Sequence, residues 1–302
     1  MLMNTYNNKK MPFSGVATAI ATPFSRGEVD LITMRELCEW QCAMGVDAIC
    51  VSGTTGEAAT LTRSERRSIV ASAKEILSDK IPLIVGCGSS DTSVACSYCR
   101  EAVMLGADAL LVITPYCNKG TKSGIIEHFK AVADAADGRD VILYNVPSRT
   151  GVDLSLEQYE ELAKIENVCA VKEAAVNMTR ITRLCKDGIL TVYSGNDDMI
   201  LPVISAGGMG VVSVLSNLVP AEVASMTRLA IDGDFKSARE IAHRYAYLVE
   251  LLFAETNPAP LKYAMSQMGL CSGEMRLPMG EISDSLKQKI SSEMKKLDLV
   301  AR

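Results

Sequence analysis

A lysine at the end of an apolar segment is the residue of this sequence whose position most directly suggests chemistry. Lys172 follows the apolar residues 168–171, although lysine is among the residues least often buried. In a strand, Val168, Ala170 and Lys172 would share one face. Burial among such neighbours disfavours the ammonium form, and a free amine can attack a ketone to form a Schiff base. Taken alone, Lys172 also fits a lysine that reaches solvent or pairs with a carboxylate.

Other polar side chains follow apolar segments in the same way. Tyr144 could pass protons to and from the lysine nitrogen, and Thr54 or Thr55 could pass them onward. The glycine-rich turn around the two threonines offers backbone N–H groups to a carboxylate. Arg149 could hold a second carboxylate with two parallel hydrogen bonds. Each residue alone also fits an ordinary structural role, such as a core tyrosine or a surface ion pair.

Histidine and cysteine usage argues against metal chemistry. The chain has two histidines, His128 and His243, which is too few for a His-rich metal site. Cys96 and Cys99 form a C-x-x-C pair, but the surrounding sequence predicts a helix and no second pair occurs. We therefore expect the ten cysteines to be mainly reduced core residues, and we predict no metal site.

The elements that must position these side chains can be predicted from hydrophobic runs. Eight runs rich in Val, Ile, Leu and Ala begin 21 to 34 residues apart. They start at Gly15, Asp47, Ile81, Ala107, Asp140, Val168, Ile189 and Gly210. Continuous apolar runs are typical of parallel strands covered on both faces. Helical patterns lie between them, with capping boxes at Thr62–Glu65 and Ser155–Gln158.

Eight strand–helix units predict an α/β fold, a (β/α)8 TIM barrel, whose chemistry lies at the carboxyl ends of the strands. A doubly wound sheet is the alternative, but the G-x-G-x-x-G motif after the first strand is absent. We predict that residues 1–219 form the barrel and carry the active site. Residues 220–302 are expected to form a C-terminal all-helical extension that packs on the barrel or on another subunit.

Charge and hydropathy exclude two classes of partner. The net charge is −5 and no basic stripe occurs, which disfavours nucleic acid. No apolar run approaches the roughly 18 residues of a membrane span, and no signal peptide precedes the polar N-terminus. A cytoplasmic protein is expected, with residues 3–8 as a frayed tail.

The motifs GTTGEAATLT, TPYCNK, LYNVPSRTG, VKEA and SGND resemble, in this order, the dihydrodipicolinate synthase family of class I aldolases. This family belongs to the N-acetylneuraminate lyase superfamily, and the likeness extends to NPAPLKYAMSQMGL and MRLPM. The resemblance implies condensation of pyruvate with L-aspartate 4-semialdehyde, the first committed step towards diaminopimelate and lysine. It also implies no cofactor and a homotetramer built from two dimers.

The resemblance assigns a role to each candidate residue. Lys172 matches the Schiff-base lysine, and Tyr144 matches the tyrosine that relays protons and contacts substrate. Thr54 matches the relay threonine, and the backbone of Thr55 would help to hold the pyruvate carboxylate. Arg149 matches the arginine that receives the carboxylate of the semialdehyde.

Two further positions match the pattern of this family, and one position differs from it. Gly195 and Val212 match backbone and apolar positions that line the pocket. In the best-known family members, a second tyrosine reaches from this position into a neighbouring subunit's site, and here the position is Cys117. A thiol is shorter and a weaker donor, so the role of Cys117 is open.

A second departure concerns regulation. Family members sensitive to lysine bind it at positions that match Ala58, Arg63, Arg66, Ser90 and Val94. Two arginines would repel a cationic amino acid, and Val94 lacks a carboxylate to hold its ammonium. We predict weak or absent inhibition by lysine.

Two alternative functions share parts of the site. Another aldolase of the superfamily, cleaving N-acetylneuraminate or 2-keto-3-deoxygluconate, would use Lys172 and Tyr144 as well. The R-T-G sequence that contains Arg149 favours the synthase, because a carboxylated aldehyde needs that guanidinium. A non-catalytic paralogue that binds a keto acid is favoured only by Cys117.

Overall fold

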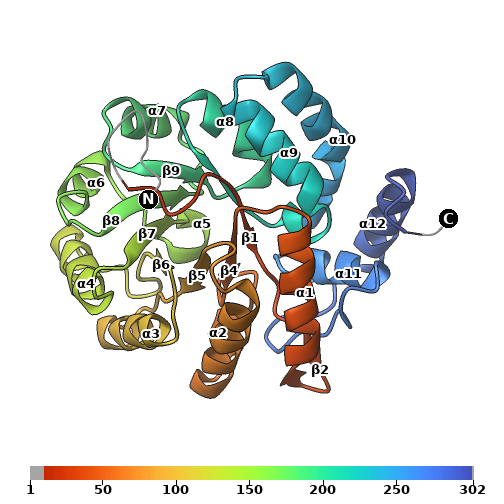
Figure 1. Ribbon diagram of the computed structural model, residues 1–302, viewed down its shortest axis with the longest axis horizontal. Helices are drawn as coiled ribbons and strands as arrows, with labels where there is room; N and C mark the ends of the chain where they lie inside the picture. Colours follow the sequence, from red (N-terminus) through yellow and green to blue (C-terminus); the bar gives the residue numbers. More distant parts are fainter. Residues whose placement is uncertain (1–9, 301–302) are drawn as a thin grey trace.

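Eight parallel strands close into a barrel at the centre of the computed structural model, which describes residues 10–300 (Figure 1). Around the barrel the order is β1, β10, β9, β8, β7, β6, β5 and β4. The strands are β1 (Gly15–Ala19), β4 (Ala48–Val51), β5 (Leu83–Gly86), β6 (Ala109–Ile113), β7 (Asp140–Asn145), β8 (Val168–Glu173), β9 (Thr191–Ser194) and β10 (Gly210–Ser213). Each lies within a predicted apolar run, so the (β/α)8 barrel is confirmed. The predicted frayed tail lies outside the described residues.

Helices connect successive strands and cover the outside of the barrel (Figure 1). They are α1 (Leu31–Ala43), α2 (Arg63–Leu77), α3 (Thr92–Met104), α4 (Lys122–Ala135), α5 (Pro147–Thr150), α6 (Leu156–Leu162), α7 (Met178–Lys186), α8 (Ile200–Ser205) and α9 (Pro220–Ile231). Short 3-10 turns are η1 (Ala58–Thr60), η2 (Asp197–Met199) and η3 (Leu215–Asn217). Both predicted capping boxes are present, at the starts of α2 and α6.

A small hairpin interrupts the first strand–helix unit. It consists of β2 (Phe24–Ser25) and β3 (Glu28–Val29), which pair antiparallel. Strands of two residues are too short to give a periodic signal, so the sequence did not predict them.

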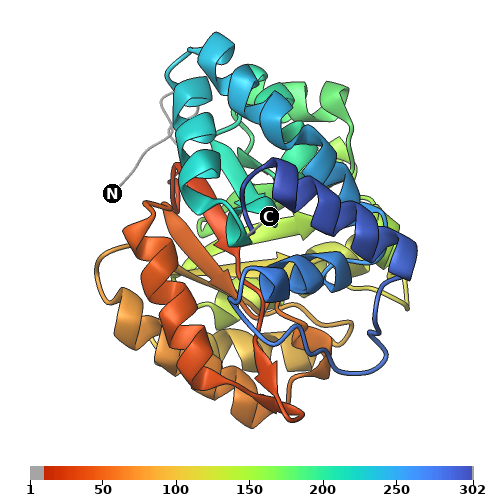
Figure 2. The ribbon, with the colours of Figure 1, turned by 90° about the vertical axis from the view of Figure 1, so that its right-hand side faces the viewer.

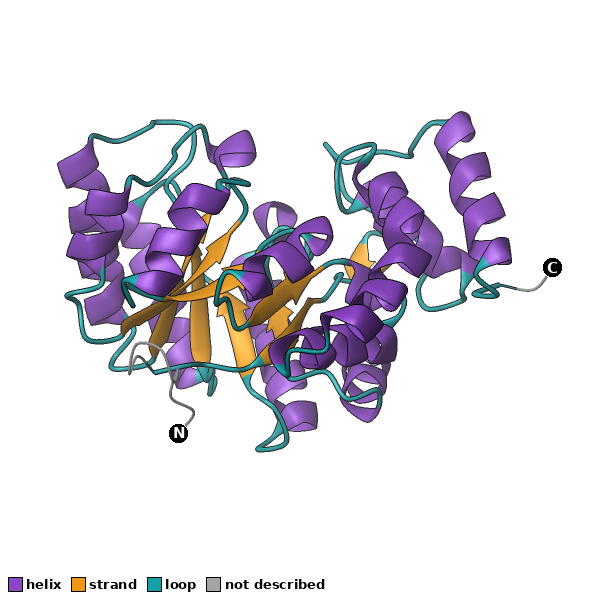
Figure 3. Cartoon of the chain, turned by 90° about the horizontal axis from the view of Figure 1, so that it is seen from above, coloured by secondary structure: helices purple, strands orange, loops and turns teal. Residues whose placement is uncertain are grey.

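Three helices follow the barrel, namely α10 (Phe235–Phe253), α11 (Ala259–Gln267) and α12 (Asp284–Lys296). Helix α10 packs on α9, and the last two helices lie to one side of the barrel (Figures 2 and 3). Helix α9 packs against β1, as the preceding helices pack on their strands. Helix α9 belongs to the predicted C-terminal extension but packs as the barrel helices do. The domain division at residues 219 and 220 stays a prediction. Among residues 10–300, no helix combines the length and apolar character needed to cross a membrane.

The barrel interior is packed separately from the layer between strands and helices. Small residues such as Ala17, Ala48 and Ala170 occupy much of it. Phe13, just before β1, stacks on Tyr193 with ring centroids 4.1 Å apart, and the Tyr193 hydroxyl donates to the Phe13 carbonyl at 2.6 Å. These two rings close the amino end of the barrel and leave its carboxyl end for the site.

Candidate active site

Lys172 lies inside the barrel near the carboxyl end of β8. Its residue is only 5% exposed, and its neighbours on the same strand face are Val168 and Ala170. Within the part of the chain that the structure describes, no carboxylate forms an ion pair with it. The predicted inward position is therefore correct, and the alternatives of a solvated or ion-paired lysine are not observed there.

Tyr144 is the direct neighbour of Lys172 across the sheet. Strands β7 and β8 are in register, so that Tyr144 pairs with Lys172. The lysine Nζ lies over the aromatic ring, 4.3 Å from its centroid. An amine over the ring face is stabilised when it carries charge, and the phenol of the same residue is close to any substrate bound to the amine.

A cavity of about 330 Å³ opens above this pair. Its walls come from the turn after β4, from the ends of β5, β6 and β7, and from segments of the C-terminal region. Of the predicted site residues, Thr54, Tyr144 and Arg149 line it. Lys172 is not among the lining residues and sits beside Tyr144 at the inner end. This volume suits small substrates, since ligand pockets for drug-sized molecules start at about 300 Å³.

The C-terminal region supplies an asparagine that joins two predicted site residues. Asn257 Nδ2 donates to Thr55 Oγ1 at 3.0 Å, and Arg149 donates to the Asn257 carbonyl at 3.1 Å. Asn257, Pro258, Pro278 and Met279 all line the cavity. These four residues were not predicted as site residues, because a helical pattern does not show which part of the molecule a segment packs against. The Asn-Pro pair was the available signal, since such a pair favours a turn.

Gly195 directly follows β9 and Val212 lies on β10, but neither lines the cavity. Val212 is buried on β10 in the same interior cluster as Tyr144. The Gly195 N–H donates to the Glu173 carbonyl at 2.8 Å. A Cβ at Gly195 would lie 2.7 Å from the Ala174 Cβ, so glycine allows the two chain segments to approach. Their predicted pocket contacts stay predictions.

A buried ion pair fixes the loop that carries the threonines. Lys262 on α11 donates to Glu57 at 2.6 Å, and both side chains are at most 1% exposed. Burial lowers the pKa of Lys262, and the Glu57 charge opposes this shift. Breaking such a pair leaves one charge buried and unpaired, which typically costs about 3–5 kcal/mol. The C-terminal region therefore holds the threonine turn rigidly.

The charge of Lys172 lowers the pKa of two other ionisable groups, Cys50 and Asp197, against the effect of their burial. Burial raises the pKa of the Cys50 thiol to about 11, and the lysine charge opposes that shift. Burial also raises the pKa of Asp197, although hydrogen bonds from Ser213 and from the backbone of Leu215 and Val214 favour its ionised form. The thiol is thus kept neutral, and the carboxylate is occupied by its own donors.

The residue in place of the family's second tyrosine is exposed. Cys117 has a positive φ of 71° and does not line the cavity, whereas Tyr116 does. The C-x-x-C pair lies buried on α3, as predicted from its helical surroundings. Among residues 10–300, no group of three or more His, Cys, Asp or Glu side chains is arranged to hold a metal ion.

A closed (β/α)8 barrel with this lysine–tyrosine pair at its carboxyl end is the framework of a lyase of the class I aldolase type. Residues 12–297 match the Dihydrodipicolinate synthetase family, and the chain belongs to this family. The chain is 42% identical to the 4-hydroxy-tetrahydrodipicolinate synthase of Alkaliphilus oremlandii, over 95% of this chain and 100% of the relative.

Solved structures agree with this assignment. A dihydrodipicolinate synthase from Aquifex aeolicus superposes with a TM-score of 0.93 at 41% identity, covering 96% of this chain and 100% of the other. A synthase from Cyanidioschyzon merolae with lysine bound has a TM-score of 0.92 at 37% identity, again over 96% and 100%. Another related structure, 37% identical over 96% of this chain and 98% of its own, is described as the first monomeric variant (TM-score 0.93).

Proposed function

We propose that this enzyme condenses pyruvate with L-aspartate 4-semialdehyde through a Schiff base on Lys172. The observation that carries the proposal is an amine buried inside the barrel, over the ring of Tyr144 and without an ion-pair partner among the described residues. A lysine amine at this place can attack the carbonyl carbon of a keto acid and form a Schiff base with it. The names of the relatives support the same reaction.

The first half of the reaction joins pyruvate to the enzyme. The pyruvate carboxylate binds at the turn of Thr54 and Thr55, and the Lys172 nitrogen attacks the C2 carbonyl. The carbonyl oxygen leaves as water once it has gained two protons, and the Tyr144 hydroxyl passes these protons with Thr54 as the next group. The imine then acts as an electron sink, so that a methyl proton leaves and an enamine forms.

The second half forms the carbon–carbon bond and releases the product. The enamine carbon attacks the aldehyde of the semialdehyde, whose carboxylate is held by Arg149, and the aldehyde oxygen becomes a hydroxyl. The imine is regenerated in this step. The substrate's own amine then attacks the imine carbon, displaces Lys172 and closes a six-membered ring. One water is lost overall, and no external oxidant or reductant is required.

Borohydride trapping tests the covalent step. With pyruvate and borohydride, peptide mass analysis should find a reduced three-carbon adduct on Lys172, and Lys172→Ala should abolish it. An adduct elsewhere, or none, would contradict the proposal. An assay with both substrates separates condensation from retro-aldol cleavage of a sugar acid, and from binding without turnover.

We also propose that the enzyme works as a homotetramer of two dimers, as family membership implies. The description of one relative as a monomeric variant supports an assembled state as the usual form in this family. Sedimentation equilibrium should therefore give four times the mass of the chain, and a monomer would refute this part.

A further inference from the structure

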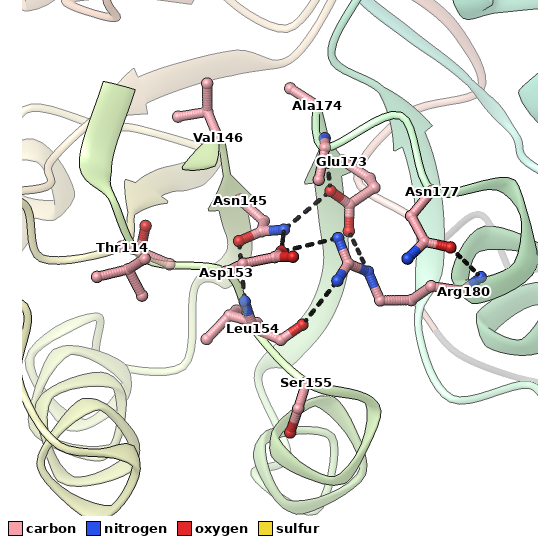
Figure 4. Close-up of polar contacts among 12 residues, drawn as sticks. Thr114, Asn145, Val146, Asp153, Leu154, Ser155, Glu173, Ala174, Asn177 and Arg180 are labelled. Atoms are coloured by element: carbon pink, nitrogen blue, oxygen red, sulfur yellow. Dashed lines mark hydrogen bonds and ion pairs between the residues drawn. The ribbon is translucent and has the colours of Figure 1, made fainter. Parts of the chain in front are cut away.

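A side-chain hydrogen bond joins the residues that follow Lys172 and Tyr144, on the outer face of the same two strands. After Tyr144 and Lys172, the next pair in register is Asn145 and Glu173. Strand alternation directs the first pair into the barrel and the second towards the helices. Asn145 Nδ2 donates to Glu173 Oε1 at 2.9 Å, which ties the strands together one residue beyond the reacting groups (Figure 4).

Both oxygens of the Glu173 carboxylate accept hydrogen bonds. Its Oε1 also accepts from the Ala175 N–H at 2.9 Å, and its Oε2 accepts from the Tyr159 hydroxyl at 2.9 Å. The Arg180 Nε lies 3.3 Å from the same oxygen, and the Glu173 side chain is fully buried. Burial raises the pKa of Tyr159, and the Glu173 charge adds to that shift, so this phenol stays a donor.

The surrounding groups extend the connection to the helix layer. Arg180, on α7, pairs with Asp153 at 2.8 Å and donates to the Leu154 carbonyl at 3.1 Å (Figure 4). Asn145 completes the ring, donating to Asp153 at 2.8 Å and accepting from the Leu154 N–H at 3.2 Å. Well-packed apolar residues often stabilise a fold as much as such a buried ion pair does. Stability alone therefore does not account for a charge at this place.

We propose that Glu173 and Asn145 are positioning residues for the reaction at Lys172. Their hydrogen bond holds the ends of β7 and β8 in register, so that the lysine nitrogen stays over Tyr144. The inference rests on the proposed Schiff-base role of Lys172. That amine has no ion-pair partner of its own among the described residues to fix its place, and a displacement of about 1 Å at a reacting centre can cost on the order of 10²-fold in rate.

The test is the rate of pyruvate trapping in two matched variants. Glu173→Leu fills a similar volume but removes the oxygen that accepts from Asn145, and it should slow borohydride trapping on the order of tenfold. The kcat should fall in parallel, while KM for the semialdehyde stays unchanged because Arg149 is untouched. Tyr159→Phe removes one hydrogen bond from the same carboxylate but leaves the Asn145 bond. It should lower Tm and trap pyruvate at the wild-type rate.

Each outcome has a distinct meaning. If the wild-type enzyme gives no adduct on Lys172, the proposed function fails first. If it does, wild-type trapping rates in Glu173→Leu overturn the positioning role. Equal slowing in both variants, following their loss of Tm, also overturns it. Should Glu173→Leu not fold, Asn145→Ala removes the cross-strand donor, together with the Asn145 bonds to Asp153 and Leu154, and must show the same slow trapping for the inference to stand.

Discussion

Individual residues of the site divide the two substrates between them. The turn of Thr54 and Thr55 follows β4, and Asn257 holds it through Thr55. Arg149 is an exposed residue of α5 and donates to the backbone carbonyl of the same asparagine. We therefore expect a keto acid bound to Lys172 to use the threonines, which leaves the arginine for the second substrate.

Replacing the arginine should separate the two halves of the reaction. Arg149→Ala should lower kcat/KM for the semialdehyde by about 10- to 100-fold, because a charge-assisted hydrogen bond contributes about 1.5–3 kcal/mol. Arg149→Lys should recover only part of this loss, since lysine lacks the planar fork. Pyruvate trapping at Lys172 should keep the wild-type rate. Equal losses in trapping and in semialdehyde turnover would contradict this division.

Weak or absent inhibition by lysine is predicted from the residues at the positions that match the family's lysine-binding site. Arg66 stacks on Tyr98 at 4.2 Å from the ring centroid, and Arg63 pairs with Glu101 at 2.6 Å. Val94 presents only an apolar side chain. A cationic amino acid meets the Arg66 guanidinium there, and the nearby Glu101 carboxylate is already paired with Arg63, so millimolar lysine should leave the initial rate unchanged. The lysine-bound relative from Cyanidioschyzon merolae provides the comparison in the same assay, and strong inhibition of this enzyme would refute the prediction.

Strand alternation was enough to predict the reacting pair but not the residues that close the site. Lys172 and Tyr144 each end an apolar run, so their inward direction follows from local sequence. Asn257 contacts Thr55 across 202 positions, and nothing local indicates such a contact. Lys262 likewise follows a helical pattern that fits a surface residue, although its side chain is fully buried.

At the scale of elements, the start of α2 is fixed by the C-terminal segment. Arg276 contacts Glu65 through both terminal nitrogens, and the same carboxylate accepts from the Thr62 N–H as part of the capping box. Hydrogen bonding to Arg276 lowers the pKa of Glu65 from 4.5 to about 2. The arginine also stacks on Phe24 of the hairpin, 4.6 Å from the ring centroid. One side chain thus joins the hairpin, α2 and the C-terminal region.

This pKa shift predicts a loss of stability in acid. Because the folded pKa of Glu65 lies below its ordinary value, its contribution is complete above about pH 5 and is lost as pH falls towards 2. We expect roughly 1–2 kcal/mol in the free energy of unfolding, allowing for partial exposure to solvent. Glu65→Gln keeps the capping geometry and should flatten this part of the pH profile in urea denaturation. An unchanged profile would contradict the assignment.

The elements that could be predicted were those marked by an apolar run or a helical period over several residues. All eight barrel strands and the capped helices follow from runs and periodicity that span several residues. The hairpin at β2 and β3 was too short to predict. The place of α9 against β1 could not be read from its sequence, since an amphipathic helix shows that one face is covered but not by which partner.

At the scale of the whole molecule, the C-terminal region is part of the site. Asn257, Pro258, Pro278 and Met279 line the cavity, and the buried Lys262–Glu57 pair anchors the region to the barrel. The cavity is therefore formed by the barrel together with the segments that connect α10 to α11 and α11 to α12.

The stacked rings of Phe13 and Tyr193 give the barrel a floor. Reactants reach the deep amine from the rim at the opposite end, and the product leaves by the same route. We therefore expect both substrates to enter through the cavity at the carboxyl end of the barrel. One of the two rings, Tyr193, is the in-register neighbour of Lys172 on β9, so the residue that closes the barrel stands on the strand next to the amine.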